Sequence, residues 1–184
     1  MEADTNRDEF DIRNVARHLE AAIIKDEKEN DDVDLTEYIT AFQELNKMFP
    51  LMGRLFSFVQ SDVADKIAVL KEYLESAEKD HYRTCKTMIM YEMKKKITHS
   101  TKPPSGSRTL LRLHRALIFV SRLIGDIHDS KPEDKLAPIA TKAYEETLAL
   151  HHSWLVRKGV HLAVYTLPYR EQVQRLYFLA AKAK

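Results

Sequence analysis

The sequence contains one cysteine, Cys85, and only four glycines among its 184 residues. A single cysteine cannot form a disulfide within the chain, so a disulfide-stapled fold is excluded and a reducing compartment is expected. The chain also lacks the Asn-Gly and Asp-Gly dipeptides that mark tight β-hairpins. We therefore expect a protein that is helical throughout.

No apolar run approaches the roughly 20 residues that a membrane-spanning helix needs. The acidic, polar N-terminus has no hydrophobic segment typical of a signal peptide. Neither charge sign dominates, because 29 basic side chains face 28 acidic ones, and this balance argues against nucleic-acid binding through bulk positive charge. The expectation is one cytoplasmic domain, and any contact that it makes with membranes is expected to be peripheral.

Apolar periodicity and cap residues place the expected helices. Asp34, followed three positions later by Glu37, has the spacing of a capping box. Ser105 or Ser107 is placed to cap the helix after the Pro- and Ser-containing loop. We expect a disordered stretch at residues 1–8 and helices at about residues 10–25, 35–49, 52–77, 81–97, 105–128, 136–150, 154–167 and 171–184.

Three arginines dominate the expected helix 105–128. Arg108, Arg112 and Arg115 are spaced by four and then three residues, so they lie along one stripe of a helix. Such a stripe is either solvated or binds an anion, and guanidinium groups suit a phosphate. The opposite side is expected to be buried, and it carries Leu110, Leu113, Leu117, Val120 and Ile124.

Two further features are ambiguous on spacing alone. Asp62 and Lys66 are four residues apart on one helix face, which favours an ordinary surface ion pair contributing about 0.3–0.5 kcal/mol. Trp154 is the only tryptophan and lies beside a polar cluster. It suits either a membrane interface or a half-buried packing position.

Catalytic and metal-binding motifs are weak. His128 and Asp129, with His114 upstream, resemble part of a metal phosphohydrolase site, but companion ligands at the required spacing are missing, so solvated histidines are favoured. The sequence has no P-loop and no nucleophile elbow. Cys85 reads as a packed thiol. We expect no cofactor, no metal and no catalysis.

Three separated blocks, residues 55–67, 105–117 and 143–158, give the chain a specific resemblance. In this order, and with the extension at 166–170, they resemble the glycolipid transfer protein superfamily and, within it, the ceramide 1-phosphate transfer branch. The resemblance spans roughly residues 10–178. It implies an all-α, two-layer helical sandwich that encloses a single lipid chamber, formed here by residues 9–184.

The resemblance also implies roles for individual residues. Asp62 corresponds to the aspartate that binds the sphingoid amide and hydroxyl, and His152 to the histidine that binds the amide carbonyl oxygen. Lys66, Arg108 and Arg112 correspond to the phosphate-selecting cations. The glycolipid branch instead carries asparagine at the lysine position and a tryptophan platform for sugar, so these differences favour a phosphate headgroup.

Four further residues complete the expected site. Arg115 is a possible auxiliary to the phosphate-binding cations because it continues their stripe. Trp154, Arg157 and Lys158 resemble the rim of the family that touches membranes, where cations meet anionic headgroups.

The resulting hypothesis is non-enzymatic transfer of ceramide 1-phosphate between membranes. The expected partners are one phosphorylated sphingolipid and a transient membrane surface, with no nucleic acid and a monomeric state. Glycosphingolipid transfer and a lipid sensor or adaptor that transfers poorly are the alternatives, with a metal phosphohydrolase more remote. After Arg170 the chain is shorter than the family pattern, so part of the chamber wall is expected to be missing.

Overall fold

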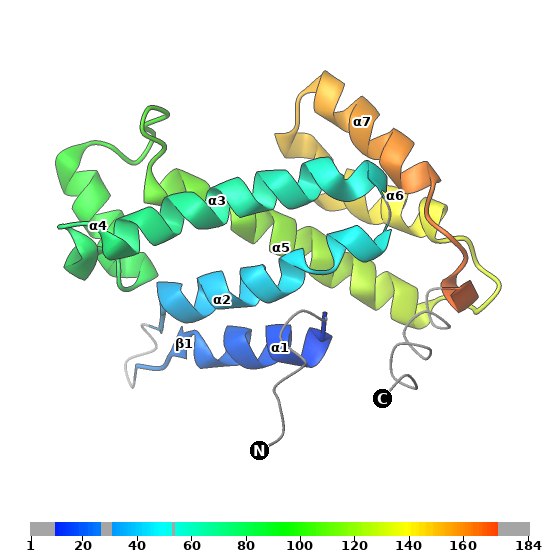
Figure 1. Ribbon diagram of the computed structural model, residues 1–184, viewed down its shortest axis with the longest axis horizontal. Coiled ribbons are helices and arrows are strands. Elements are labelled where there is room, and N and C mark those ends of the chain that lie inside the picture. Colours follow the sequence, from blue (N-terminus) through cyan, green and yellow to red (C-terminus); the bar gives the residue numbers. More distant parts are fainter. Residues whose placement is uncertain (1–9, 27–30, 53, 173–184) are drawn as a thin grey trace, which may run out of the picture. The chain divides into compact units, whose positions relative to one another are not determined.

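The computed structural model describes residues 10–26, 31–52 and 54–172. The disorder predicted for residues 1–8 lies outside these ranges, as does most of the helix predicted after Glu171. The described part divides into two compact units, one up to Leu113 and one from His114 onward. Both are built mainly from helices, as the sequence predicts (Figure 1).

The first unit begins with α1 (Ile12–Ala21) and α2 (Leu35–Asn46), which pack against each other. Asp34 caps α2 by accepting a hydrogen bond from the backbone N–H of Glu37, which confirms the predicted cap. The Glu37 carboxylate contacts His18 Nδ1 at 2.7 Å and so links the two helices. Buried side chains of α1 and α2 form this part of the core: Val15, Leu35, Ile39, Phe42 and Leu45.

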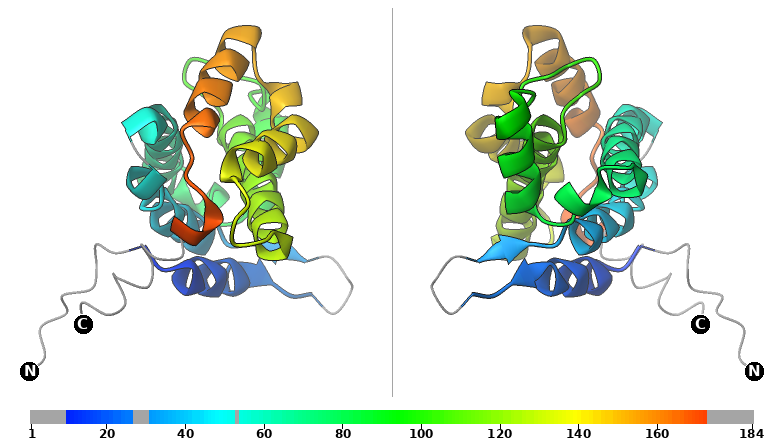
Figure 2. Two further views of the ribbon diagram at one scale, coloured as in Figure 1. Left: turned by 90° about the vertical axis from the view of Figure 1, so that its right-hand side faces the viewer. Right: turned by 90° about the vertical axis from the view of Figure 1, so that its left-hand side faces the viewer.

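A small antiparallel sheet corrects the prediction of an entirely helical chain. The strands β1 (Ile23–Ile24) and β2 (Asp32–Val33) pair Ile23 with Val33, and Figure 2 shows them side by side near the end of α1. The helix predicted to reach residue 25 therefore ends at Ala21, and Ile23 is exposed. Two β-branched residues in succession favour this extended backbone.

Two predicted helices start later than expected. The segment after Pro50 forms the 3₁₀ turns η1 (Phe49–Met52) and η2 (Arg54–Phe56) before α3 (Ser57–Glu75) begins. A further 3₁₀ turn, η3 (Lys79–His81), precedes α4 (Cys85–Lys95), which is capped by Thr84. Proline lacks a backbone N–H, which explains why the α-helix does not run through position 50.

The long helix α5 (Gly106–Asp129) starts in the first unit and continues into the second. Its predicted buried side is right for Leu110, Leu113 and Val120 and wrong for Ile124, which is 42% exposed. Leu123 is buried instead, because it packs with α6 (Leu136–Thr147) and α7 (Trp154–Tyr165).

The second unit has its own core. A cluster of buried residues joins α5, α6 and α7: Leu123, Ala140, Ala143 and Val164. The short turn η4 (Ala149–His151) connects α6 to α7, and α6 (yellow) and α7 (orange) lie next to each other in Figures 1 and 2. Small alanine side chains on α6 allow this close packing.

Candidate functional site

The start of α5 positions the arginine stripe. Ser105 Oγ accepts a hydrogen bond from the backbone N–H of Arg108 at 3.2 Å, so Ser105 is the cap, one of the two serines that the sequence offered. The carbonyl oxygen of Ser105 accepts the N–H of Thr109 at 3.0 Å, the first bond of the helical pattern. Arg108 thus lies in the first turn of α5, where its own backbone N–H and that of Thr109 both donate to Ser105.

A buried carboxylate completes this turn. Glu92 of α4 is fully buried, and its two oxygens accept the N–H groups of Gly106 at 2.7 Å and Ser107 at 3.0 Å. The hydroxyl of Tyr82 donates to Glu92 at 3.2 Å, and burial raises the pKa of Tyr82. Glu92 is not among the site residues predicted from the sequence. The available signal was its position four residues after the buried Met88, on the apolar side of α4.

The three arginines differ in exposure. Arg108 and Arg115 are half-buried, whereas Arg112 is exposed. Within the described ranges none of the three guanidinium groups forms an ion pair, unlike Arg122 farther along α5, which pairs with Asp126 and Glu146. The stripe therefore presents cationic groups that no described acidic side chain neutralises.

Asp62 and Lys66 are brought together on α3. Lys66 Nζ lies 2.5 Å from Asp62 Oδ1 and also donates to the backbone oxygen of Asp62 at 3.2 Å. The lysine side chain is only 15% exposed, while the aspartate side chain is 67% exposed. The carboxylate of this pair is therefore accessible, whereas the ammonium group is on a mostly covered side chain. The spacing alone predicted a pair in which both side chains lie at the surface.

His152 lies in the second unit, at the end of η4. Its Nδ1 is 2.8 Å from the hydroxyl of Tyr144, whose side chain is buried in α6. Burial raises the pKa of Tyr144, so the hydroxyl keeps its proton at neutral pH. This contact orients the imidazole ring, since Tyr144 is itself fixed by edge-on contacts with Phe119 and His161.

The start of α7 carries the predicted membrane rim. Trp154 is 71% exposed, and Lys158 Nζ lies 5.7 Å from the centre of its ring. Arg157 forms an ion pair with Glu145 of α6 at 3.2 Å. Large apolar side chains are exposed nearby in the sequence: Leu150, Leu155, Val156, Leu162 and Tyr165. The segment thus combines an exposed indole, exposed aliphatic groups and cations.

The remaining sequence candidates do not form a site. Within the described part of the chain no cluster of three or more His, Cys, Asp or Glu side chains is suited to a metal. Cys85 is half-buried, and burial raises the pKa of its thiol. Among the described residues, no helix is long and apolar enough to cross a membrane.

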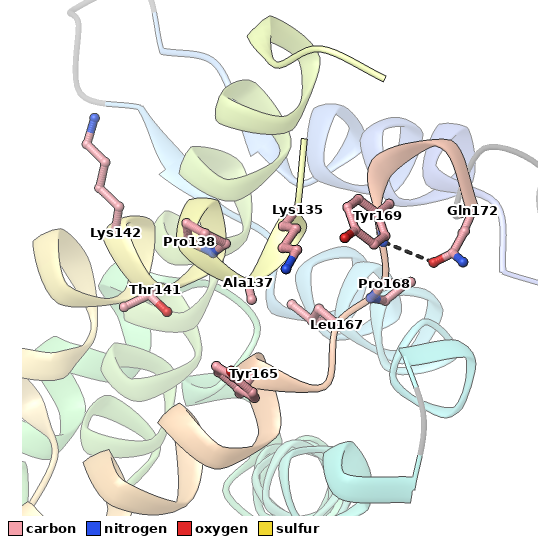
Figure 3. A pocket seen from close by; sticks show the side chains of 10 residues that line it. All are labelled: Lys135, Ala137, Pro138, Thr141, Lys142, Tyr165, Leu167, Pro168, Tyr169 and Gln172. Atoms are coloured by element: carbon pink, nitrogen blue, oxygen red, sulfur yellow. Dashed lines mark hydrogen bonds between the residues drawn. The ribbon is translucent and has the colours of Figure 1, made fainter. Parts of the chain in front are cut away.

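A cavity of about 780 Å³ lies in the second unit, between the start of α6 and the turn after α7 (Figure 3). Lys135 Nζ lies 5.6 Å from the ring centre of Tyr169, and Gln172 accepts the backbone N–H of Tyr169. Tyr165 and Leu167 add apolar walls. None of the residues predicted to bind the headgroup lines this cavity.

The chain is similar to known proteins over most of its length. Residues 33–177 match the family described as Glycolipid transfer protein (GLTP). The ceramide-1-phosphate transfer protein of Danio rerio is 36% identical over 168 residues, which cover 89% of this chain and 78% of that protein.

Solved structures agree with the sequence comparison. The crystal structure of human ceramide-1-phosphate transfer protein in complex with 2:0 ceramide-1-phosphate matches with a TM-score of 0.79 and 31% identity, over 88% of this chain and 78% of that one. The apo form of the mouse protein matches with a TM-score of 0.80 and 31% identity, over 89% and 78% of the two chains.

Proposed function

Because the chain belongs to the glycolipid transfer protein family and has its helical fold, we propose that it carries ceramide 1-phosphate between membranes without catalysing a reaction. The observation that carries the proposal is the set of cations in the first unit. Lys66 is mostly covered, and Arg108 and Arg112 form no ion pair with any residue in the described ranges. Close relatives named for ceramide 1-phosphate give the anion that this set would bind.

The charge of the headgroup matches these residues. A phosphomonoester carries about 1.5 to 2 negative charges at neutral pH and several acceptor oxygens. One ammonium group and two guanidinium groups supply the opposite charge and the paired hydrogen bonds that arginine makes with phosphate. A neutral sugar would leave the cations to repel one another, so the cluster disfavours a glycolipid. Arg115 serves as an auxiliary on the same stripe.

Asp62 and His152 are proposed to bind the ceramide amide region. The exposed carboxylate of Asp62 accepts hydrogen bonds from the sphingoid amide N–H and hydroxyl. When Tyr144 donates to His152 Nδ1, the neutral imidazole carries its proton on Nε2, which then donates to the amide carbonyl oxygen. These contacts recognise the sphingolipid backbone, whereas the cations recognise the phosphate.

The hydrocarbon chains are proposed to enter a single apolar chamber of the two-layer sandwich. Burying each CH₂ group contributes about 0.8 kcal/mol, so the chains supply most of the affinity while the headgroup residues choose the lipid. Trp154 and Lys158 are proposed to contact the membrane surface, with Arg157 shared between Glu145 and anionic headgroups. The protein then acts as a cytoplasmic monomer that associates with membranes reversibly.

The test is native mass spectrometry after incubation with vesicles that contain ceramide 1-phosphate, a neutral glycosphingolipid and ceramide with matched chains. We expect wild-type protein to carry ceramide 1-phosphate, and Lys66→Ala and Arg108→Leu to lose it while keeping the helical circular dichroism spectrum. The matched controls are Lys71→Ala on α3 and Arg122→Leu on α5, which remove the same charges elsewhere on the same helices.

Each alternative gives a different result. Preferential capture of the glycosphingolipid by the wild type would assign the protein to glycolipid transfer. Capture of ceramide 1-phosphate without movement between donor and acceptor vesicles would identify a sensor or adaptor. Unchanged capture by both Lys66→Ala and Arg108→Leu would refute the site assignment.

A further inference from the structure

The first turn of α5 has no backbone donor left for a ligand. Gly106 and Ser107 donate to Glu92, Arg108 donates to Ser105 Oγ, and Thr109 donates to the Ser105 carbonyl oxygen. A helix N-terminus normally attracts an anion through such groups. Here a carboxylate of the protein already occupies that end, so a phosphate must be held by side chains that project from this turn.

The turn is also enclosed by packing. A Cβ atom on Gly106 would lie 2.5 Å from Met88 Sδ and 3.2 Å from Glu92 Oε1, so side chains of α4 pack against the α5 backbone so closely that a larger residue would force a neighbour to shift. Tyr82, which donates to Glu92, stacks on Tyr73 of α3 with ring centres 4.4 Å apart. The hydroxyl of Tyr73 donates to the carbonyl oxygen of Pro104, just before the turn. Side chains of α3 and α4 therefore fix where α5 begins.

We propose that Glu92 is a positioning residue for the headgroup site. Its carboxylate, bound by Gly106 and Ser107, fixes the first turn of α5 and so sets where Arg108, the next residue, presents its guanidinium group. The inference rests on the proposed function, in which Arg108 binds the lipid phosphate. Glu92 itself is fully buried and is assigned no contact with the lipid.

Glu92→Gln distinguishes the positioning role from a purely electrostatic role and from a purely structural role, because each role predicts a different change in lipid binding. Glutamine keeps the shape but offers only one acceptor oxygen, so one backbone N–H faces an amide N–H₂ group. A positioning role predicts weaker binding of the phosphate headgroup with ceramide binding preserved. A purely electrostatic role predicts stronger phosphate binding, since a negative charge near the cations is removed. A purely structural role predicts the same loss for every lipid.

The measurement is the ratio of ceramide 1-phosphate affinity to ceramide affinity, with matched acyl chains, at a temperature where each variant is fully folded. The control is Ile39→Val, which loosens the core of α2 far from α5 in sequence and lowers stability by about 0.5–1.5 kcal/mol. We expect Glu92→Gln to reduce the ratio about tenfold, the order of one charge-assisted hydrogen bond, and Ile39→Val to leave it unchanged. A ratio that stays at the wild-type value, or rises, would overturn the proposal.

Amide hydrogen exchange provides a readout that does not depend on the lipid. Exchange at Gly106 and Ser107 should become at least about tenfold faster in Glu92→Gln, while the amides of α2 keep their wild-type rates. Unchanged exchange at these two amides also overturns the proposal. If wild-type protein shows no preference for the phosphate, the proposed function fails, and exchange alone decides whether Glu92 holds the turn. If Glu92→Gln does not fold, Tyr82→Phe takes its place, because it removes one of the three hydrogen bonds that the Glu92 carboxylate accepts. Tyr82→Phe should lower the affinity ratio and speed the exchange of the two amides, each by less than Glu92→Gln. No change in either measurement overturns the proposal.

Discussion

Gly106 and Gly125 lie on the same helix and should respond to alanine with opposite signs. At Gly106 the added Cβ would lie 2.5 Å from Met88 Sδ and 3.1 Å from Tyr82 Cε1. Both neighbours are buried, so neither side chain can swing into solvent. Overpacking of this kind typically costs about 1–3 kcal/mol. For a protein of this size that corresponds to a melting temperature lower by roughly 2–12 °C.

Gly125 supplies the control. A Cβ there meets no atom within 4 Å, and the position is an exposed one within α5. Because glycine is less favourable than alanine inside a helix, Gly125→Ala should stabilise the protein by about 0.5–1 kcal/mol. Thermal unfolding followed by circular dichroism at 222 nm measures both variants. Equal melting temperatures for the two, or a higher one for Gly106→Ala, would refute the packing assigned to the start of α5.

The difference in exposure between the cations predicts how much each contributes to binding. Lys66→Ala should weaken ceramide 1-phosphate binding by about 10- to 150-fold, the range for hydrogen bonds to charged groups. Arg112→Leu should weaken it less, because water screens the exposed guanidinium group. Isothermal titration with a short-chain lipid ranks the two, and a larger loss for Arg112→Leu would contradict the order. Tyr144→Phe should weaken the binding of phosphorylated and of unphosphorylated ceramide by about fivefold each, since it removes the hydrogen bond that orients His152. The same titrations measure both affinities. An effect confined to the phosphorylated lipid would be inconsistent with this role. Cys85 should react with a thiol reagent at pH 8 more slowly than free cysteine because burial raises its pKa and lowers the thiolate fraction, and unfolding in guanidinium chloride should abolish the difference.

Local signals in the sequence were enough for several features. Asp34 was predicted as a cap residue and Ser105 as one of two candidates, because a cap depends on side chains within three or four positions of the N–H groups they bind. Apolar spacing identified most of the buried side of α5 for the same reason. The small sheet was missed, since pairing of Ile23 with Val33 depends on a contact between separate segments that no hairpin dipeptide announces.

The buried side of α5 shows where spacing becomes ambiguous. After Val120 a helix stripe can continue at either 123 or 124, three or four residues on. Leu123 is chosen because it meets Ala140, Ala143 and Val164 of the second unit, and Ile124 is left exposed. A sequence pattern gives the direction of a face only to within about one residue, whereas packing selects the side chain that has a partner.

The sequence by itself determined which cations are proposed to bind the phosphate, because the resemblance that assigns this role to Lys66, Arg108 and Arg112 rests on residue identities alone. Only the tertiary structure decided that Lys66 is mostly covered and that the turn carrying Arg108 is held by Glu92. It leaves the Lys66 side chain 15% exposed, and it brings the carboxylate of Glu92 to the first turn of α5, 14 residues away in sequence from Gly106. The physical reason is that hydrogen bonds and burial depend on distances between separate helices, and these distances arise only when the core packs.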